Sequence, residues 1–143
     1  MSQNWVKDIN EMQTKYKVHE WISKADEDQL RSYLEFRVDF LKEELEETES
    51  ALINMDAEEI VDGLIDLCVV AIGTLDAFDI DPYEAWDRVL KANMNKQVGI
   101  KEGRPNPLGL PDLMKPADWK APSHEGNHGC LLYTSPSPRD RVQ

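Results

Sequence analysis

The side chains of this sequence with the clearest chemical potential are carboxylates in two consecutive stretches. The first stretch, residues 40–49, carries Glu43, Glu44, Glu46 and Glu47. The second, residues 57–78, is almost wholly apolar and yet contains Glu59, Asp62 and Asp66. Acids among apolar residues need a partner, because a buried unpaired carboxylate costs several kcal/mol. Whether these acids can bind a common partner depends on how the helices that carry them place them in space.

Helical spacing places these acids on facing surfaces. At about 100° per residue, Glu59, Asp62 and Asp66 fall within roughly 60° of one another on a helix. On the preceding helix Glu44 lies beside the apolar stripe, and Glu47 follows one turn later, whereas the neighbouring acid at position 46 points to solvent. A short connection at residues 49–55 predicts an antiparallel pair of helices, each directing carboxylates at the other.

Simpler explanations cover some of these acids. Glu58 and Glu59 would lie in the first turn of a helix, where acids favour the positive end of the dipole. The run around residues 43–49 could be a solvated acidic face. Asp62 and Asp66 fit neither explanation, because they lie past the first turn among apolar residues, and the nearby cations are too few to pair every acid. A hard divalent cation resolves the conflict, and Mg²⁺, which prefers oxygen ligands and keeps waters and phosphates in its shell, is the expected one.

The elements around these acids are expected to be all-α, with no strand pattern anywhere. A short amphipathic helix begins at Trp5, and a break follows around residues 18–25. A capping pattern of Ser23 with Asp26 opens a long helix, and a second such pattern, Asp56 with Glu59, opens the apolar helix to about residue 78. A last helix begins at Pro82 and ends near residue 96. We therefore predict a bundle of four helices that forms oligomers, because so few helices cover the apolar one incompletely.

The whole chain constrains the class of protein. Its 143 residues allow one domain, and its net charge of −12 argues against nucleic acid or an anionic membrane as partner. No run of about 18 apolar residues and no apolar leader are present. The two cysteines, Cys68 and Cys130, form no disulfide framework, so we expect a cytoplasmic protein.

The acids also form an ordered pattern. Residues 43–47 read EExxE, and residues 59–62 read ExxD. This order, continued by AIGTLDAFDIDPYEAW and the NMNK of residues 93–96, resembles the MazG-like all-α nucleoside triphosphate pyrophosphohydrolases. The phosphoribosyl-ATP pyrophosphohydrolase-like branch, common in bacteria and their phages, is the most similar. The resemblance covers residues 9–96, and the segment DLMKPADWKAP is similar to the tail of such proteins.

The resemblance implies roles for individual residues. The metal ligands of the family correspond to Glu44, Glu47, Glu59 and Asp62. Glu43 would orient or deprotonate water, and Asp66 would belong to the surroundings of the metal or to a second cation. Asn93 and Lys96 would bind substrate, although a lysine at a helix C-terminus is also favoured by the dipole alone. The three histidines, His19, His124 and His128, fit no ligand spacing and are expected to be surface residues.

The implied reaction is Mg²⁺-dependent hydrolysis of a (deoxy)nucleoside triphosphate between the α- and β-phosphates, with Mn²⁺ as a substitute ion. The products would be a nucleoside monophosphate and pyrophosphate. Two alternatives stay open: phosphoribosyl-ATP as the substrate, and a non-catalytic helical interaction module. The expected assembly is a homodimer or homotetramer, with a nucleotide as the only partner and neither nucleic acid nor membrane.

The C-terminal part of the chain is expected to be irregular. Residues 1–98 would form the helical pyrophosphohydrolase domain, and residues 99–129 a Pro- and Gly-rich arm. The string CLLYTSPSPRD, which begins at Cys130, resembles the in-frame translation of a sequencing adapter. We therefore expect residues 130–143 to be a foreign tail outside the fold.

Overall fold

The fold was analysed in a computed structural model, which describes residues 1–100, 103 and 108–131. The chain divides into two compact units. The helical unit contains Met1–Pro82 and the described residues from His128 onward, and the second unit contains Tyr83–Asn127. Five helices and one pair of short strands make up the described chain, so the all-α class is confirmed. The predicted bundle of four helices is not confirmed, because Val18–Lys24 forms an additional helix and the predicted last helix lies in the second unit. No helix in these described ranges is long and apolar enough to cross a membrane.

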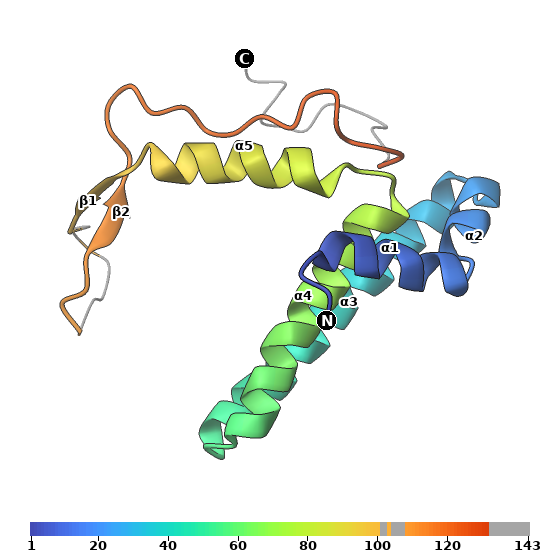
Figure 1. Ribbon diagram of the computed structural model, residues 1–143, viewed down its shortest axis with the longest axis horizontal. Helices are drawn as coiled ribbons and strands as arrows, with labels where there is room; N and C mark the ends of the chain where they lie inside the picture. Colours follow the sequence, from blue (N-terminus) through green and yellow to red (C-terminus); the bar gives the residue numbers. More distant parts are fainter. Residues whose placement is uncertain (101–102, 104–107, 132–143) are drawn as a thin grey trace. The chain divides into compact units, whose positions relative to one another are not determined.

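Four helices build the helical unit, and two of them form its long hairpin (Figure 1). They are α1 (Trp5–Lys15), α2 (Val18–Lys24), α3 (Glu27–Ile53) and α4 (Ala57–Ala77). Helices α3 and α4 run antiparallel along their length, as predicted, while α1 packs against α4. The connection between α3 and α4 is shorter than the sequence indicated, because α3 continues to Ile53. Only three residues, with Met55 at a φ of 51°, make the turn.

The helix starts show which capping patterns hold. Asp56 caps α4 as predicted, since its carboxylate accepts the Glu59 N–H at 3.2 Å. The predicted cap of α3 at Ser23 is wrong, because that hydroxyl donates to the Glu20 carbonyl inside α2. Asp26 caps α3 instead, in a reciprocal capping box with Gln29. Both α3 and α4 thus begin at an aspartate whose carboxylate accepts the backbone N–H of the residue three positions later.

The predicted break at residues 18–25 is also wrong, since α2 occupies most of it. Lys17, in the left-handed region at a φ of 60°, separates α2 from α1. Helix α2 has only seven residues, and Ile22 is its single buried side chain. Two turns are too few to display a helical period in the sequence, so the segment gave no pattern to detect.

The core of the helical unit gathers at one end of the hairpin. Five buried residues form it, namely Ile22, Leu30, Ala77, Phe78 and Ile80. The ring of Tyr33 packs at 5.8 Å from that of Phe78. Further along α4, apolar side chains stay exposed: Val61 is 63% accessible and Leu64 is 51% accessible. The sequence predicted this incomplete cover, because so few helices cannot surround an apolar one.

The second unit consists of one helix and the chain that returns along it. Helix α5 (Pro82–Met94) begins at the predicted proline and ends two residues before the predicted end. Strands β1 (Gln97–Gly99) and β2 (Asp112–Met114) pair antiparallel, with Val98 opposite Leu113. The sequence indicated no strand here, because three-residue strands are too short to show an alternating pattern. The arm is therefore less irregular than expected.

The start of the predicted foreign tail lies within the described chain. The Cys130 N–H donates to the Phe78 carbonyl at 2.8 Å, and Cys130 and Leu131 pack against the core of the helical unit. Residues 132–143 lie outside the described residues. The adapter origin of this segment and the predicted domain boundaries stay predictions.

Candidate active site

Helices α3 and α4 approach closely where the acids are concentrated, and a glycine allows this approach. Gly63 is buried, and a Cβ at this position would collide with the Thr48 hydroxyl. That hydroxyl donates to the Glu44 carbonyl at 2.8 Å, so Thr48 is held in place on α3. The contact brings the acid-bearing turns of the two helices together, because Glu44 is one turn from Thr48 and Asp62 adjoins Gly63.

The approach of the two helices affects the burial and the pKa of Glu44. One of its oxygens, Oε2, is buried and has no hydrogen-bond partner among the described residues. Burial raises the pKa of Glu44 above its ordinary value, and the negative charges of Glu47 and Asp66 raise that pKa further. Asp66 lies on the other helix, so the structure brings together carboxylates from both members of the hairpin. Negative charges collected around a partly buried carboxyl group repel one another, and a bound cation would relieve that repulsion.

The acids of α4 differ in burial and in the effect of their surroundings on their pKa. Burial raises the pKa of Asp66, and its neighbour Asp62 adds to that effect through charge and a side-chain hydrogen bond. The expectation that Asp62 is buried is wrong, because its side chain is exposed and Asp66 is the half-buried member of the pair. The apolar neighbours of Asp62 are themselves largely exposed in the single chain, so they do not cover it. Asp66 is therefore the acid of this pair that the fold covers more, and its functional role stays a prediction.

The outer members of the predicted set are more exposed. Glu59 lies in the first turn of α4, where its N–H donates to the capping Asp56, as the dipole explanation predicts. Glu43 is exposed, and its charge adds to the raised pKa of Glu44. Within residues 1–100, 103 and 108–131, no group of three or more His, Cys, Asp or Glu side chains is placed to hold a metal ion. The described arrangement thus combines a close contact between the helices at Thr48 and Gly63 with several acids on the turns around it.

The cations near the hairpin are engaged elsewhere. Arg37 donates from Nε to the Thr74 hydroxyl at 3.0 Å and from Nη2 to the Val70 carbonyl at 2.9 Å. Lys42 lies 3.9 Å from Asp39 on the exposed side of α3. Neither contact involves the facing carboxylates, which supports the inference that the local cations are too few.

The donor chemistry of this cluster fits Mg²⁺. All the candidate donors are carboxylate oxygens, which hard divalent cations prefer, and the Glu44 Oε2 atom is a buried acceptor lacking a described donor. Mg²⁺ in proteins is commonly bound by one or two carboxylates, and waters and substrate phosphates complete its shell. Carboxylates from α3 and α4 are donors of the kind that such an ion takes.

The two predicted substrate-binding residues, Asn93 and Lys96, lie in the second unit. Both are half-buried, and the Lys96 ammonium lies 5.4 Å from the centre of the Trp119 ring. Trp119 in turn donates its indole N–H to the Ala92 carbonyl at 2.7 Å. This lysine is therefore packed against the arm, a contact that its position near a helix end did not reveal.

The three histidines are less exposed than the sequence indicated, because His19, His124 and His128 are all half-buried, and the Nδ1 atom of His124 is buried. His19 is only partly exposed, and its Nε2 lies 2.8 Å from a carboxylate oxygen of the buried Asp76. The other oxygen of that carboxylate accepts from the Asn10 side chain at 2.9 Å. Asn10, His19 and Asp76 connect α1 and α2 to α4. No local spacing could have indicated this contact, because 57 residues separate the histidine from the aspartate.

The fold is all-α, and the helical unit carries acids on both helices of its hairpin. A sequence model of the phosphoribosyl-ATP pyrophosphohydrolase family matches residues 15–93, more than half of the chain. The chain belongs to this family, a branch of the MazG-like superfamily, and is a pyrophosphohydrolase. No curated protein and no solved structure matches it.

Proposed function

We propose that the chain hydrolyses a (deoxy)nucleoside triphosphate between the α- and β-phosphates, in a reaction that depends on Mg²⁺. The observation that carries the proposal is the buried Oε2 of Glu44, which accepts no described hydrogen bond while the negative charges of Glu47 and Asp66 act on the same carboxyl group. Like charges packed together are unfavourable, and a bound cation with a phosphate ligand would relieve the repulsion. Family membership supports the phosphoanhydride as the bond that is cleaved.

Each acid has a proposed task. Glu44, Glu47, Glu59 and Asp62 would hold Mg²⁺, and the position of Asp66 beside Glu44 adds it to this set. When bound, the ion neutralises phosphate oxygens and lowers the pKa of water. Glu43 would accept a hydrogen bond from the attacking water and so orient it. Asn93 and Lys96 would bind the substrate, with the lysine countering phosphate charge.

A second candidate substrate is phosphoribosyl-ATP, which the description of the matching family favours. Both substrates have the same bond between α- and β-phosphates, so the carboxylates would act in the same way on either. The difference lies in the recognition of the base and its attached group.

One experiment tests the reaction and separates these substrates. A panel of nucleoside triphosphates, their deoxy forms and phosphoribosyl-ATP would be incubated with the full chain and Mg²⁺, and pyrophosphate and orthophosphate would be measured separately. We expect pyrophosphate with one substrate preferred, and no release after chelation. Orthophosphate as the main product, or no turnover of any member, would refute the proposed reaction.

We also propose that the chain acts as a homodimer or homotetramer in the cytoplasm, without a nucleic-acid or membrane partner. The exposed apolar side chains of α4 support association, because a second copy would remove them from water. Sedimentation at micromolar concentration tests this, and a well-folded monomer would contradict it.

A further inference from the structure

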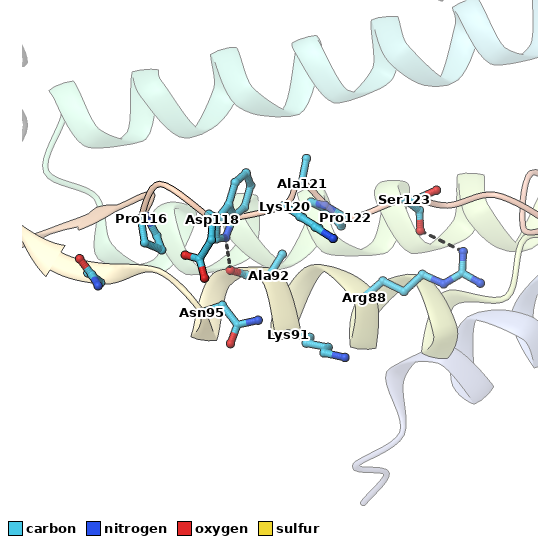
Figure 2. A pocket seen from close by; sticks show the side chains of 12 residues that line it. Arg88, Lys91, Ala92, Asn95, Pro116, Asp118, Lys120, Ala121, Pro122 and Ser123 are labelled. Carbon is cyan, nitrogen blue, oxygen red and sulfur yellow. Dashed lines mark hydrogen bonds between the residues drawn. The ribbon is translucent and has the colours of Figure 1, made fainter.

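The second unit contains a cleft that no part of the proposed hydrolysis uses. The cleft lies between α5 and the arm and has a volume of about 660 Å³ (Figure 2). Its walls come from α5, through Arg88, Lys91 and Asn95, and from residues 116–123 of the arm. All of its lining residues belong to the second unit, whereas every acid of the candidate active site belongs to the helical unit.

Hydrogen bonds hold the arm to α5 at both ends of this cleft. At one end, the Trp119 indole donates to the Ala92 carbonyl at 2.7 Å. At the other, Arg88 donates from Nη1 to the carbonyls of Ser123 and Glu125, each at 3.0 Å. Figure 2 shows Arg88 reaching from α5 toward Ser123 on the arm. Anchoring at two points keeps the walls in place without a ligand, which lowers the ordering cost of binding.

The charge of the cleft is opposite to that of the protein as a whole. Lys91 and Lys120 line it and are exposed. The ammonium group of Lys115 lies 4.9 Å from the ring centre of Trp119, a wall of the same cleft. Among the lining residues, all of them described, only Asp118 is acidic. Positive groups collected in a chain of net charge −12 indicate an anionic ligand.

The volume of the cleft and its uncharged lining residues indicate which class of anionic ligand it can bind. A volume of about 660 Å³ lies in the range of small-molecule sites, roughly 300–1,000 Å³. Pro116 and Pro122 supply apolar wall, and Asn95 and Gln97 supply amide groups that both donate and accept. A phosphate is attracted to lysine as a point charge, while a base needs apolar contact together with amide partners. The lining provides both kinds of contact.

We propose that this cleft binds a nucleoside phosphate, with Lys91 and Lys120 countering the phosphate and Asn95 and Gln97 contacting the base. The site uses none of the carboxylates of α3 and α4 and needs no metal ion. It is a second nucleotide site on the chain, and it does not depend on the proposed hydrolysis.

Binding to the full chain in the presence of a chelator tests the proposal. Calorimetry would compare a nucleoside monophosphate with inorganic pyrophosphate and with the uncharged nucleoside. We expect the nucleoside monophosphate to bind at least tenfold more tightly than either, because each lacks one half of the recognised chemistry. The double variant Lys91→Gln/Lys120→Gln should weaken its binding at least tenfold, at an unchanged melting temperature.

Matched controls locate the site. The variant Lys7→Gln/Lys24→Gln removes the same charge from exposed positions of α1 and α2 and should bind as the original chain does. Glu44→Gln should also keep metal-free binding. If the original chain binds the nucleoside monophosphate in this cleft but releases no pyrophosphate from any substrate, only the proposed reaction is refuted.

Several results would overturn the cleft proposal. One is the absence of metal-free binding, and another is equal binding by the Lys91→Gln/Lys120→Gln variant and the original chain. Binding that disappears in Glu44→Gln would place the nucleotide at the hairpin. Pyrophosphate or a single-stranded oligonucleotide that binds as tightly as the mononucleotide would remove the nucleoside phosphate as the ligand.

Discussion

The two units of this chain differ in charge far more than in size. Residues 1–82 carry 21 acidic side chains and 7 basic ones, whereas residues 83–127 carry 6 acidic and 7 basic ones. The first segment therefore accounts for the acidity of the whole protein, and its acids include a buried, unpartnered carboxylate oxygen. The second presents lysines around an aromatic wall. Net charge for the whole chain hides this division, because one average covers two regions with opposite binding preferences.

The largest expected effect is the loss of pyrophosphate release when one acid of the hairpin is removed, because the acids are proposed to bind Mg²⁺ together. Changing Glu44 or Asp62 to Ala should lower pyrophosphate release by at least about a hundredfold, more than the loss of an outer partner of a metal site costs. Helicity should stay near that of the original chain. Glu46→Ala is the matched control, because Glu46 lies on the exposed side of the same helix. Near-normal turnover by Asp62→Ala would show that the ligand assignment is wrong.

The next effect tests whether the approach of α3 and α4 creates the site. Gly63→Ala should lower the free energy of unfolding by about 1–3 kcal/mol, because the new methyl group meets the Thr48 hydroxyl. Thermal unfolding measures the loss. The double variant Gly63→Ala/Thr48→Ala should recover part of it, since it removes that hydroxyl. No recovery would mean that the close contact lies elsewhere.

A smaller effect belongs to the second unit. Trp119→Phe removes the indole hydrogen bond to the Ala92 carbonyl and keeps an aromatic ring, so it should cost about 1 kcal/mol of local stability. Hydrogen exchange should accelerate in α5 and the arm and stay unchanged in α3 and α4. Equal acceleration in both units would show that they unfold as one.

The smallest effect separates stability from activity within the hairpin. Without metal, Glu44→Gln should raise the free energy of unfolding by about 0.5 kcal/mol, or roughly 2 °C in melting temperature, because solvent screens the repulsion between partly exposed charges. The stability rises because one of several repelling charges disappears. The same variant should lose turnover. Differential scanning in chelator, with Glu46→Gln as the control, measures the change, and a lower melting temperature would contradict the repulsion.

Sequence patterns predicted the structure correctly where a feature depends on residues that are close together in the sequence. The cap at Asp56, the proline start of α5 and the antiparallel hairpin all depend on spacings of a few residues. Burial was harder to predict, because it depends on which elements cover a helix face: Asp62 lies among apolar residues in the sequence and yet is exposed, whereas Asp66 is half-buried. Contacts across long separations, such as His19 with Asp76 and Trp119 with Ala92, leave no periodic trace in a sequence.

The three-residue turn between α3 and α4 has a consequence for the speed of folding. A short connection costs little loop entropy, so contacts nearest the turn can form before those at the far end of the hairpin. The acids lie on the turn side of the ties that Arg37 makes to Val70 and Thr74. The earliest contacts of the hairpin would therefore form against charge repulsion. A divalent cation should then accelerate refolding of this hairpin as well as stabilise it, because the repulsion is already present in the transition state.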